Sequence, residues 1–151
     1  MYNHNHYATT AVKITQREDS CTVSNVPEMS TLQRDIDFYV DATVIASYSD
    51  YTTRVGCIAA KGNKIIAVAS NRLRNSALNV PYGEATTHAE MNVLNMLGET
   101  GRVTLYIARL GKMEQELPSR PCVNCLKAIL KTDIREIVYM DKSGHVVKER
   151  L

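Results

Sequence analysis

The sequence predicts a layered α/β domain built around one mixed β-sheet. Runs rich in β-branched residues alternate with amphipathic segments of helical period, which is the pattern of a sheet covered by helices. Short connections at 61–63 and 141–144 each join two predicted strands, so each of these pairs must be antiparallel. The length of 151 residues and the mass of 16.9 kDa suit one domain of this kind.

The chain begins with a segment that does not fit the sheet. Residues 1–29 are polar and have no sustained period, so we expect a flexible N-terminal tail in which His4 and His6 are solvated. The domain, 30–151, then opens with a helix, because Ser30 and Gln33 have the spacing of a capping box and precede an apolar stripe.

The remaining elements follow from periodicity and from the residues that end them. The helices are expected at 30–47, 88–97 and 121–132, and the strands at 54–60, 64–70, 103–109, 135–140 and 145–149. Pro121 suits the first turn of a helix. The segment 71–87 reads as a long loop, of the kind that is often functional, and 110–120 reads as a polar connection. Cys57, inside the first strand, is expected to be a small buried residue.

Four residues at the starts of two predicted helices carry the candidate chemistry, namely His88, Glu90, Cys122 and Cys125. Helices that follow neighbouring strands begin at the same edge of a sheet, so these side chains can converge. One imidazole and two thiolates suit Zn²⁺, and three protein ligands leave the fourth position for water, as in catalytic zinc sites. A carboxylate at the helix start can then transfer a proton.

His-Ala-Glu at 88–90 followed by Pro-Cys-Val-Asn-Cys at 121–125 resembles the signature of the zinc-dependent cytidine and deoxycytidylate deaminase superfamily. The resemblance covers about residues 30–150. It implies a cytidine-deaminase-like three-layer fold, with a five-stranded mixed sheet and helices on both faces. It also implies Zn²⁺ on His88, Cys122 and Cys125, and Glu90 as the proton shuttle. The implied reaction is hydrolytic deamination of a cytosine nucleoside or nucleotide to the uracil product.

The resemblance also implies a small-molecule substrate and a homo-oligomer, and it leaves the branch of the family open. Residues 53–58 resemble the first strand of deoxycytidylate-type enzymes, whereas an antiparallel last strand resembles the free-nucleoside enzymes. The connection 110–120 is longer than in known members, and Arg120 stands where many relatives carry Ser or Glu. Both features bear on the shape of the pocket.

Six residues are candidates for substrate contacts. Asn71 is similar to a substrate-facing Asn of the family. Arg72 and Arg74 offer paired donors to a phosphate, and Tyr82 offers a ring that can stack on a base. Ala89 and Arg120 complete the set through their positions beside Glu90 and Pro121.

Other interpretations were weighed on the same residues. Polynucleotide deamination is the main alternative, but the absence of Trp, the single Phe and a net charge of +2 favour a small substrate. Cys122 and Cys125 could form a redox pair, a fourth ligand could close the zinc site in a non-catalytic module, and Glu90 could cap its helix together with Thr87. The chain has no apolar run of about 20 residues and no secretion signal, so a cytoplasmic protein without a membrane span is expected.

Overall fold

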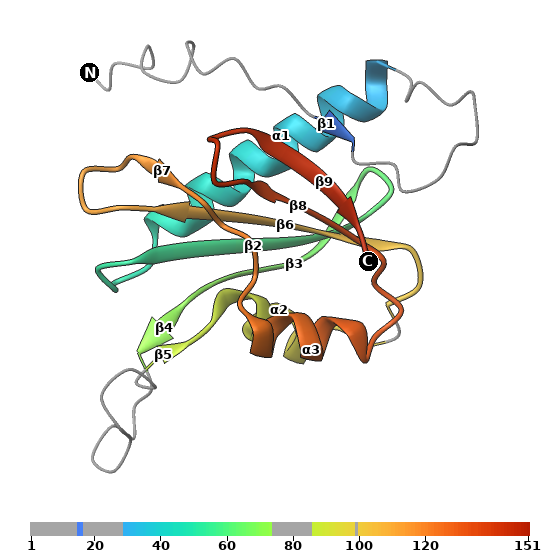
Figure 1. Cartoon of the computed structure of the whole chain (residues 1–151). Helices are drawn as coiled ribbons and strands as arrows, with labels where there is room; N and C mark the ends of the chain where they lie inside the picture. Colours follow the sequence, from blue (N-terminus) through green and yellow to red (C-terminus); the bar gives the residue numbers. More distant parts are fainter. Residues whose placement is uncertain (1–14, 17–28, 74–85, 99) are drawn as a thin grey trace.

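A mixed sheet forms the centre of the computed structural model, which describes residues 15–16, 29–73, 86–98 and 100–151 (Figure 1). The strand order is β1-β9-β8-β6-β2-β3, and a short strand β7 also pairs with β6. The strands of this sheet are β1 (Thr15–Gln16), β2 (Arg54–Lys61), β3 (Lys64–Ser70), β6 (Val103–Leu110), β7 (Glu116–Leu117), β8 (Glu136–Met140) and β9 (Val146–Arg150). The predicted α/β class and mixed sheet are confirmed.

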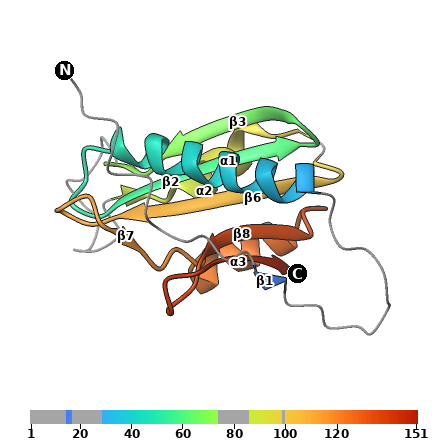
Figure 2. The same cartoon turned by 90° about the horizontal axis from the view of Figure 1, so that it is seen from above.

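Helices cover both faces of the sheet. Helix α1 (Met29–Ser47) packs along β2 and β6 on one face (Figure 2). Helices α2 (Ala89–Met96) and α3 (Val123–Leu130) pack on the other face (Figure 1). Three layers therefore result, as the family resemblance implied.

The pairing directions follow from the lengths of the connections. β2 pairs antiparallel with β3 and β6, and β8 pairs antiparallel with β9 across the short turn predicted at 141–144. β6 and β8 are parallel, which requires a crossover, and α3 supplies it. The prediction of an antiparallel last strand is confirmed.

Alternation along β6 separates the two halves of the core. Leu105 and Ile107 face the cluster under α2 and α3, whereas Tyr106 and Ala108 face the cluster under α1. Odd-numbered residues of this strand therefore point toward α2 and α3, at whose starts the predicted zinc ligands lie.

Helix α1 lies unusually close to the sheet at Gly56. A Cβ atom at this position would collide with the helix backbone at Ala42 and Ala46. Both alanines are fully buried. Gly56 permits this approach because it has no side chain to separate β2 from the backbone of α1.

A polar cluster is buried beneath α1. Asp35, which is 1% exposed, accepts hydrogen bonds from the Tyr106 hydroxyl at 2.6 Å and from the Lys148 Nζ at 3.0 Å. Lys148 also lies 3.4 Å from Glu136. Burial, followed by the hydrogen bond to Asp35, raises the pKa of the Tyr106 hydroxyl. The donors and acceptors of this cluster therefore find their partners within the protein.

Three local predictions need correction. Helix α1 begins at Met29, and the Gln33 side chain donates to Asp37, so the predicted capping box is not formed. The connection 110–120 contains β7, which folds back on β6 as a hairpin. The loop 71–87 contains β4 (Arg72–Leu73) and β5 (Thr86–Thr87), which pair with each other. A two-residue strand has too few positions for any period to be visible in the sequence.

The tail is described at two positions. Thr15 and Gln16 pair in parallel with β9. The candidates His4 and His6 lie outside the described residues. No helix in the described part of the chain is long and apolar enough to cross a membrane.

Candidate metal centre and active site

His88, Cys122 and Cys125 lie where α2 and α3 begin. His88 is the N-cap residue of α2, and Cys122 is the N-cap residue of α3. Both residues have extended backbone, which turns the chain into the helix. The backbone N–H of Cys125 points at the Cys122 Sγ at 3.5 Å. A helix N-terminus favours negative charge, so this position suits a thiolate.

The three side chains converge on one point. The His88 Nδ1 lies 3.6 Å from the Cys122 Sγ and 3.4 Å from the Cys125 Sγ. All three ligand atoms lie within 4.8 Å of one another. A tetrahedral ion with Zn–S bonds of about 2.3 Å and Zn–N bonds of about 2.0 Å requires N···S separations of roughly 3.5 Å. The donor set and its spacing therefore fit Zn²⁺.

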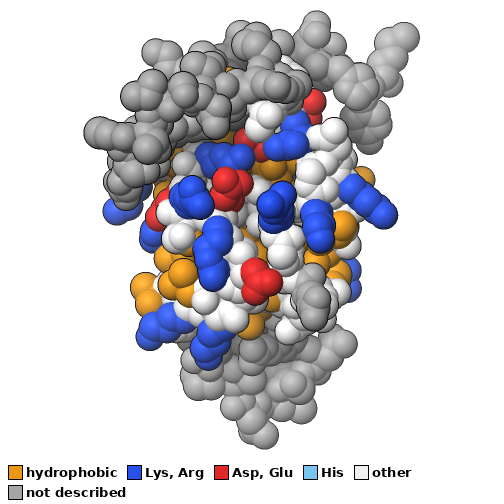
Figure 3. All heavy atoms as spheres, turned by 90° about the vertical axis from the view of Figure 1, so that its right-hand side faces the viewer, with side chains coloured by type: hydrophobic (Ala, Val, Ile, Leu, Met, Phe, Trp, Pro, Cys, Tyr) orange, Lys and Arg blue, Asp and Glu red, His pale blue; other side chains and the backbone are white. Residues whose placement is uncertain are grey.

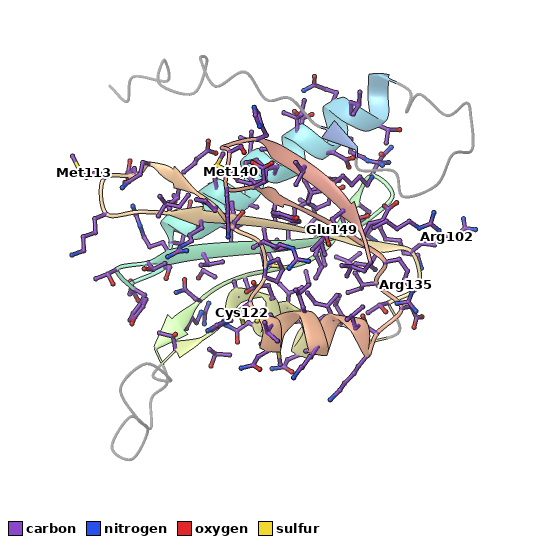
Figure 4. The ribbon with its side chains drawn as sticks, in the orientation of Figure 1. Arg102, Met113, Cys122, Arg135, Met140 and Glu149 are labelled. Atoms are coloured by element: carbon purple, nitrogen blue, oxygen red, sulfur yellow. The ribbon has the colours of Figure 1, made fainter. Side chains whose placement is uncertain are left out.

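The group contains three protein ligands. Among the residues that the structure describes, no fourth histidine, cysteine or carboxylate joins it. His88 and Cys122 are exposed, so the group is open toward solvent on one side. Figure 4 labels Cys122 at the start of α3. An open coordination position is the feature that separates catalytic from closed structural zinc sites.

Glu90 occupies the first turn of α2 and is 4% exposed. Burial raises the pKa of its carboxyl group, while its own backbone N–H and the nearby His88 oppose that rise. The N-cap of α2 is His88, without a side-chain cap, so the capping box of Thr87 and Glu90 is not formed. A buried carboxyl group beside the metal ligands is placed to exchange protons within the cavity.

Cys57 lies in β2 and is fully buried, as predicted for a small core residue. Burial raises the pKa of its thiol well above the ordinary value, and the neighbouring Glu90 and Cys125 add to this rise. Cys57 therefore packs beside the site, and the group of converging ligand atoms consists of His88, Cys122 and Cys125 without it.

A cavity of about 300 Å³ opens beside the metal ligands. Its walls come from the ends of β2, β3 and β6, the start of α2 and the segment before α3. The lining residues are Tyr51, Thr53, Val55, Asn71, Thr86, His88, Glu90, Arg109, Pro118, Ser119, Arg120 and Cys122. The volume is at the lower end of the range for small-molecule sites.

Ser119 fixes the segment before α3. Its buried hydroxyl donates to the Ile107 carbonyl at 2.7 Å and accepts from the Met140 N–H at 3.0 Å. The Ser119 N–H also donates to the Met140 carbonyl at 3.0 Å. These bonds join the segment to β6 and β8, so the position of Cys122 is set by the sheet as well as by α3.

Asn71 and Arg120 line the cavity but also bind the protein itself. The Asn71 side chain donates to the Thr53 carbonyl and accepts from the Val55 N–H, each at 2.8 Å. Arg120 makes two hydrogen bonds to Glu149, at 2.9 and 3.1 Å, and Glu149 also accepts from Tyr139. Glu149 is labelled on β9 in Figure 4.

The other substrate candidates are placed less centrally. Ala89 is fully buried at the start of α2, between His88 and Glu90. Arg72 is exposed on β4 and is not among the residues that line the cavity. Arg74 and Tyr82 lie outside the described residues. Their contacts with a substrate stay predictions.

Arg109, which lines the cavity from the end of β6, was not among the site residues predicted from the sequence. The predicted strand 103–109 ended on this residue, and no role was given to it. A signal was present, because alternation places Arg109 on the same face as the buried Leu105 and Ile107. A charged residue in register with core residues indicates a special environment.

Comparison with known proteins assigns the family. The model of the cytidine and deoxycytidylate deaminase zinc-binding region matches residues 32–141. The match covers well over half of the chain, and the protein belongs to this family. The predicted superfamily is confirmed, and the zinc-binding region of the family agrees with Zn²⁺ as the metal of the His/Cys/Cys group.

Solved structures with the same fold include enzymes of both branches. A dCMP deaminase from the cyanophage S-TIM5 in apo form has a TM-score of 0.57 at 18% identity, covering 76% of this chain and 95% of that chain. Its complex with dCMP and dUMP gives 0.54 at 16%, covering 70% and 79%. A cytidine deaminase from Burkholderia pseudomallei gives 0.55 at 16%, covering 76% and 91%. A comparison with curated protein sequences gives no match.

Proposed function

We propose that this protein catalyses the zinc-dependent hydrolytic deamination of a cytosine nucleoside or nucleotide, releasing ammonia and the uracil product. The observation that carries the proposal is the position of Glu90. Its buried carboxyl group lines the same cavity as His88 and Cys122, two of the three residues that fit Zn²⁺. A proton carrier and a metal site that share one cavity are the parts that hydrolytic deamination needs.

The residues of the chain take separate roles in this reaction. When bound by His88, Cys122 and Cys125, the metal lowers the pKa of a water molecule and so supplies the nucleophile. Glu90 accepts a proton as the water adds to C4 of the base. Glu90 passes this proton to N3, then takes the second proton of the former water from the new C4 hydroxyl and delivers it to the amino group, which leaves as ammonia. Water and the cytosine base enter, and ammonia and the uracil base leave, so atoms and charge balance.

Burial of Glu90 supports this role. The raised pKa of its carboxyl group brings the protonated and ionised forms closer in free energy, so the group can both accept and return a proton.

The size of the cavity supports a small substrate. A volume of about 300 Å³ accommodates one nucleotide-sized molecule. The fold is shared by a dCMP deaminase and by a cytidine deaminase with similar TM-scores, 0.57 and 0.55, so the likeness in fold favours neither substrate.

Ammonia release by the purified, zinc-loaded protein tests the proposal. The substrates are cytidine, deoxycytidine, their monophosphates and triphosphates, and a cytosine-containing single-stranded DNA oligonucleotide. Turnover of any monomer supports the proposed function. Turnover of the oligonucleotide alone, or of no substrate in the set, contradicts it.

Polynucleotide deamination gains no support from the face shown in Figure 3. Lys and Arg side chains are spread over the face at the right of Figure 1, with Asp and Glu between them (Figure 3). Arg102 and Arg135 lie on that side, whereas Cys122 lies at the other end of α3 (Figure 4). The basic side chains of this face are therefore not gathered beside the metal ligands, where a strand carrying the target base would have to run.

Two further predictions from the sequence belong to the proposal. We expect a cytoplasmic enzyme of nucleotide metabolism, and a homo-oligomer. Light scattering after size-exclusion chromatography tests the second, and a monomeric mass would contradict it.

A further inference from the structure

Arg109 lies near the end of β6, at a position whose neighbours on the adjacent strands are apolar. Its cross-strand partners are Val55 on β2 and Leu117 on β7. Neither partner has a polar side chain. Strand alternation places Arg109 on the same face as Ile107, toward α2 and α3, and its side chain lines the cavity that contains His88 and Glu90.

The Arg109 guanidinium has an unsatisfied donor. Its Nε is buried and has no hydrogen-bond partner. In the described part of the chain, two other buried side-chain atoms share this condition, the Arg34 Nε and the Tyr39 hydroxyl, and both belong to α1 rather than to the cavity. A buried donor without a partner is costly, so such a group usually awaits an acceptor.

Arg120, the other arginine that lines the cavity, differs from Arg109 because it has a charged partner. It lies 2.9 Å from Glu149 in an ion pair. Within the described residues, no carboxylate lies within 4.0 Å of the Arg109 guanidinium. The cavity therefore holds one arginine whose charge is already compensated and one whose charge is not.

Resting on the proposed function, we propose that Arg109 is a specificity-determining residue that binds the phosphate of a mononucleotide substrate. A guanidinium presents parallel donors that match two phosphate oxygens, and it stays charged at all working pH values. A phosphate would supply both the missing acceptor and the missing negative charge. Flanking by Val55 and Leu117 holds the stem of Arg109, so the group is preorganised for this contact.

Calorimetric binding of deoxyuridine 5′-monophosphate and of deoxyuridine to the zinc-loaded protein tests this inference without turnover. The wild-type protein should bind the monophosphate more tightly than the nucleoside. Arg109→Gln should lower affinity for the monophosphate about 10- to 100-fold, the range for hydrogen bonds to a charged group. Affinity for the nucleoside should change less than threefold.

Arg54→Gln is the matched control. Arg54 lies on β2, one residue before Val55, so it points to the opposite face of the sheet and binds the Gly111 carbonyl and Glu114. This variant should keep the wild-type preference for the monophosphate. Loss of that preference in Arg54→Gln to the same extent as in Arg109→Gln would overturn the assignment.

Arg109→Lys extends the test if Arg109→Gln does not fold. Lysine keeps the charge but loses the paired donors, so affinity for the monophosphate should fall severalfold while affinity for the nucleoside is unchanged. Unchanged affinity for the monophosphate, or an equal loss for both ligands, overturns the inference. Equal wild-type affinities for the two ligands overturn it as well.

Turnover separates this inference from the proposed function. With deoxycytidine 5′-monophosphate as substrate, Arg109→Gln should raise KM and leave kcat nearly unchanged, because the phosphate lies away from the reacting carbon. Selective binding of the monophosphate without ammonia release would contradict the proposed function and leave the phosphate site standing. Ammonia release from monomers, together with unchanged monophosphate affinity and KM in Arg109→Gln, would support the proposed function and overturn the phosphate site. Turnover of a single-stranded oligonucleotide but not of the monophosphate would overturn the mononucleotide assignment.

Discussion

Two clusters of polar side chains lie on opposite faces of the same sheet, and they differ in where their partners come from. Under α1, Asp35 is bonded by Tyr106 and Lys148. Under α2 and α3, the ligand atoms of His88, Cys122 and Cys125 lie within 4.8 Å of one another, and Glu90 lines a cavity. In the first cluster Asp35, Tyr106 and Lys148 bind one another within the chain, although the buried Nε of the neighbouring Arg34 makes no hydrogen bond, whereas the second cluster is complete only with a metal and a substrate.

The contrast shows how burial of polar groups can serve stability or chemistry. A satisfied network stabilises one arrangement of the chain, because removing one member leaves another uncompensated. An unsatisfied cluster costs stability but keeps its donors and acceptors available to ligands. Changes on the α1 side should therefore alter unfolding without altering zinc content, and changes on the other side should alter zinc content and turnover first.

Removal of a zinc ligand should have the largest effect. Cys125→Ala should abolish stoichiometric zinc binding and lower turnover by at least about 10³-fold, because two remaining ligands hold the metal poorly. Zinc content by mass spectrometry and ammonia release measure the two effects. Cys57→Ala, which removes a buried thiol outside the ligand group, is the control and should retain one zinc per chain.

Overpacking beneath α1 should have the next largest effect. Gly56→Ala places a methyl group against the helix backbone at Ala42 and Ala46, and we expect a loss of about 3 kcal/mol in the free energy of unfolding. Denaturant unfolding measures it. Gly98→Ala, where a Cβ meets no atom within 4 Å, should change stability by less than about 0.5 kcal/mol. Equal stability of the two variants would refute the close approach of α1.

Removal of one charge from the polar cluster beneath α1 should have a smaller effect on the free energy of unfolding. Asp35→Asn removes the negative charge that faces Lys148, although Lys148 keeps Glu136 as a partner at 3.4 Å. We expect a loss of about 2 kcal/mol in the free energy of unfolding, with zinc content unchanged. Asp41→Asn, an exposed change on the same helix, is the control. Loss of zinc from Asp35→Asn would contradict the claim that changes on the α1 side alter unfolding without altering zinc content.

Those parts of the fold and site that depend on local pattern could be predicted from the sequence. The antiparallel last strand followed from the short link before it, and the strand Lys64–Ser70 followed from its run of β-rich residues. The grouping of His88 with Cys122 and Cys125 was predicted from helices that follow neighbouring strands. In the structure β2 separates β3 from β6, but both are antiparallel to β2, so their carboxyl ends still lie at one edge of the sheet.

The parts that depend on contacts between distant segments could not be predicted. β7 forms because two residues return along β6, and no periodicity marks so short a strand. The pairing of Arg120 with Glu149 joins residues 29 positions apart, and only the position of β9 brings them together. Strand alternation gave a signal for Arg109, but its apolar neighbours Val55 and Leu117 follow only from the pairing of β6 with β2 and β7.

The most direct test of the central claim compares Glu90→Gln with the wild-type protein at equal zinc content. The amide keeps the size of the side chain but cannot accept and return a proton. We predict one zinc per chain in both proteins, and a loss of about 10²- to 10⁴-fold in ammonia release from the best cytosine monomer in Glu90→Gln. Full turnover by zinc-loaded Glu90→Gln would contradict the role of this buried carboxyl group, and with it the proposed deamination mechanism.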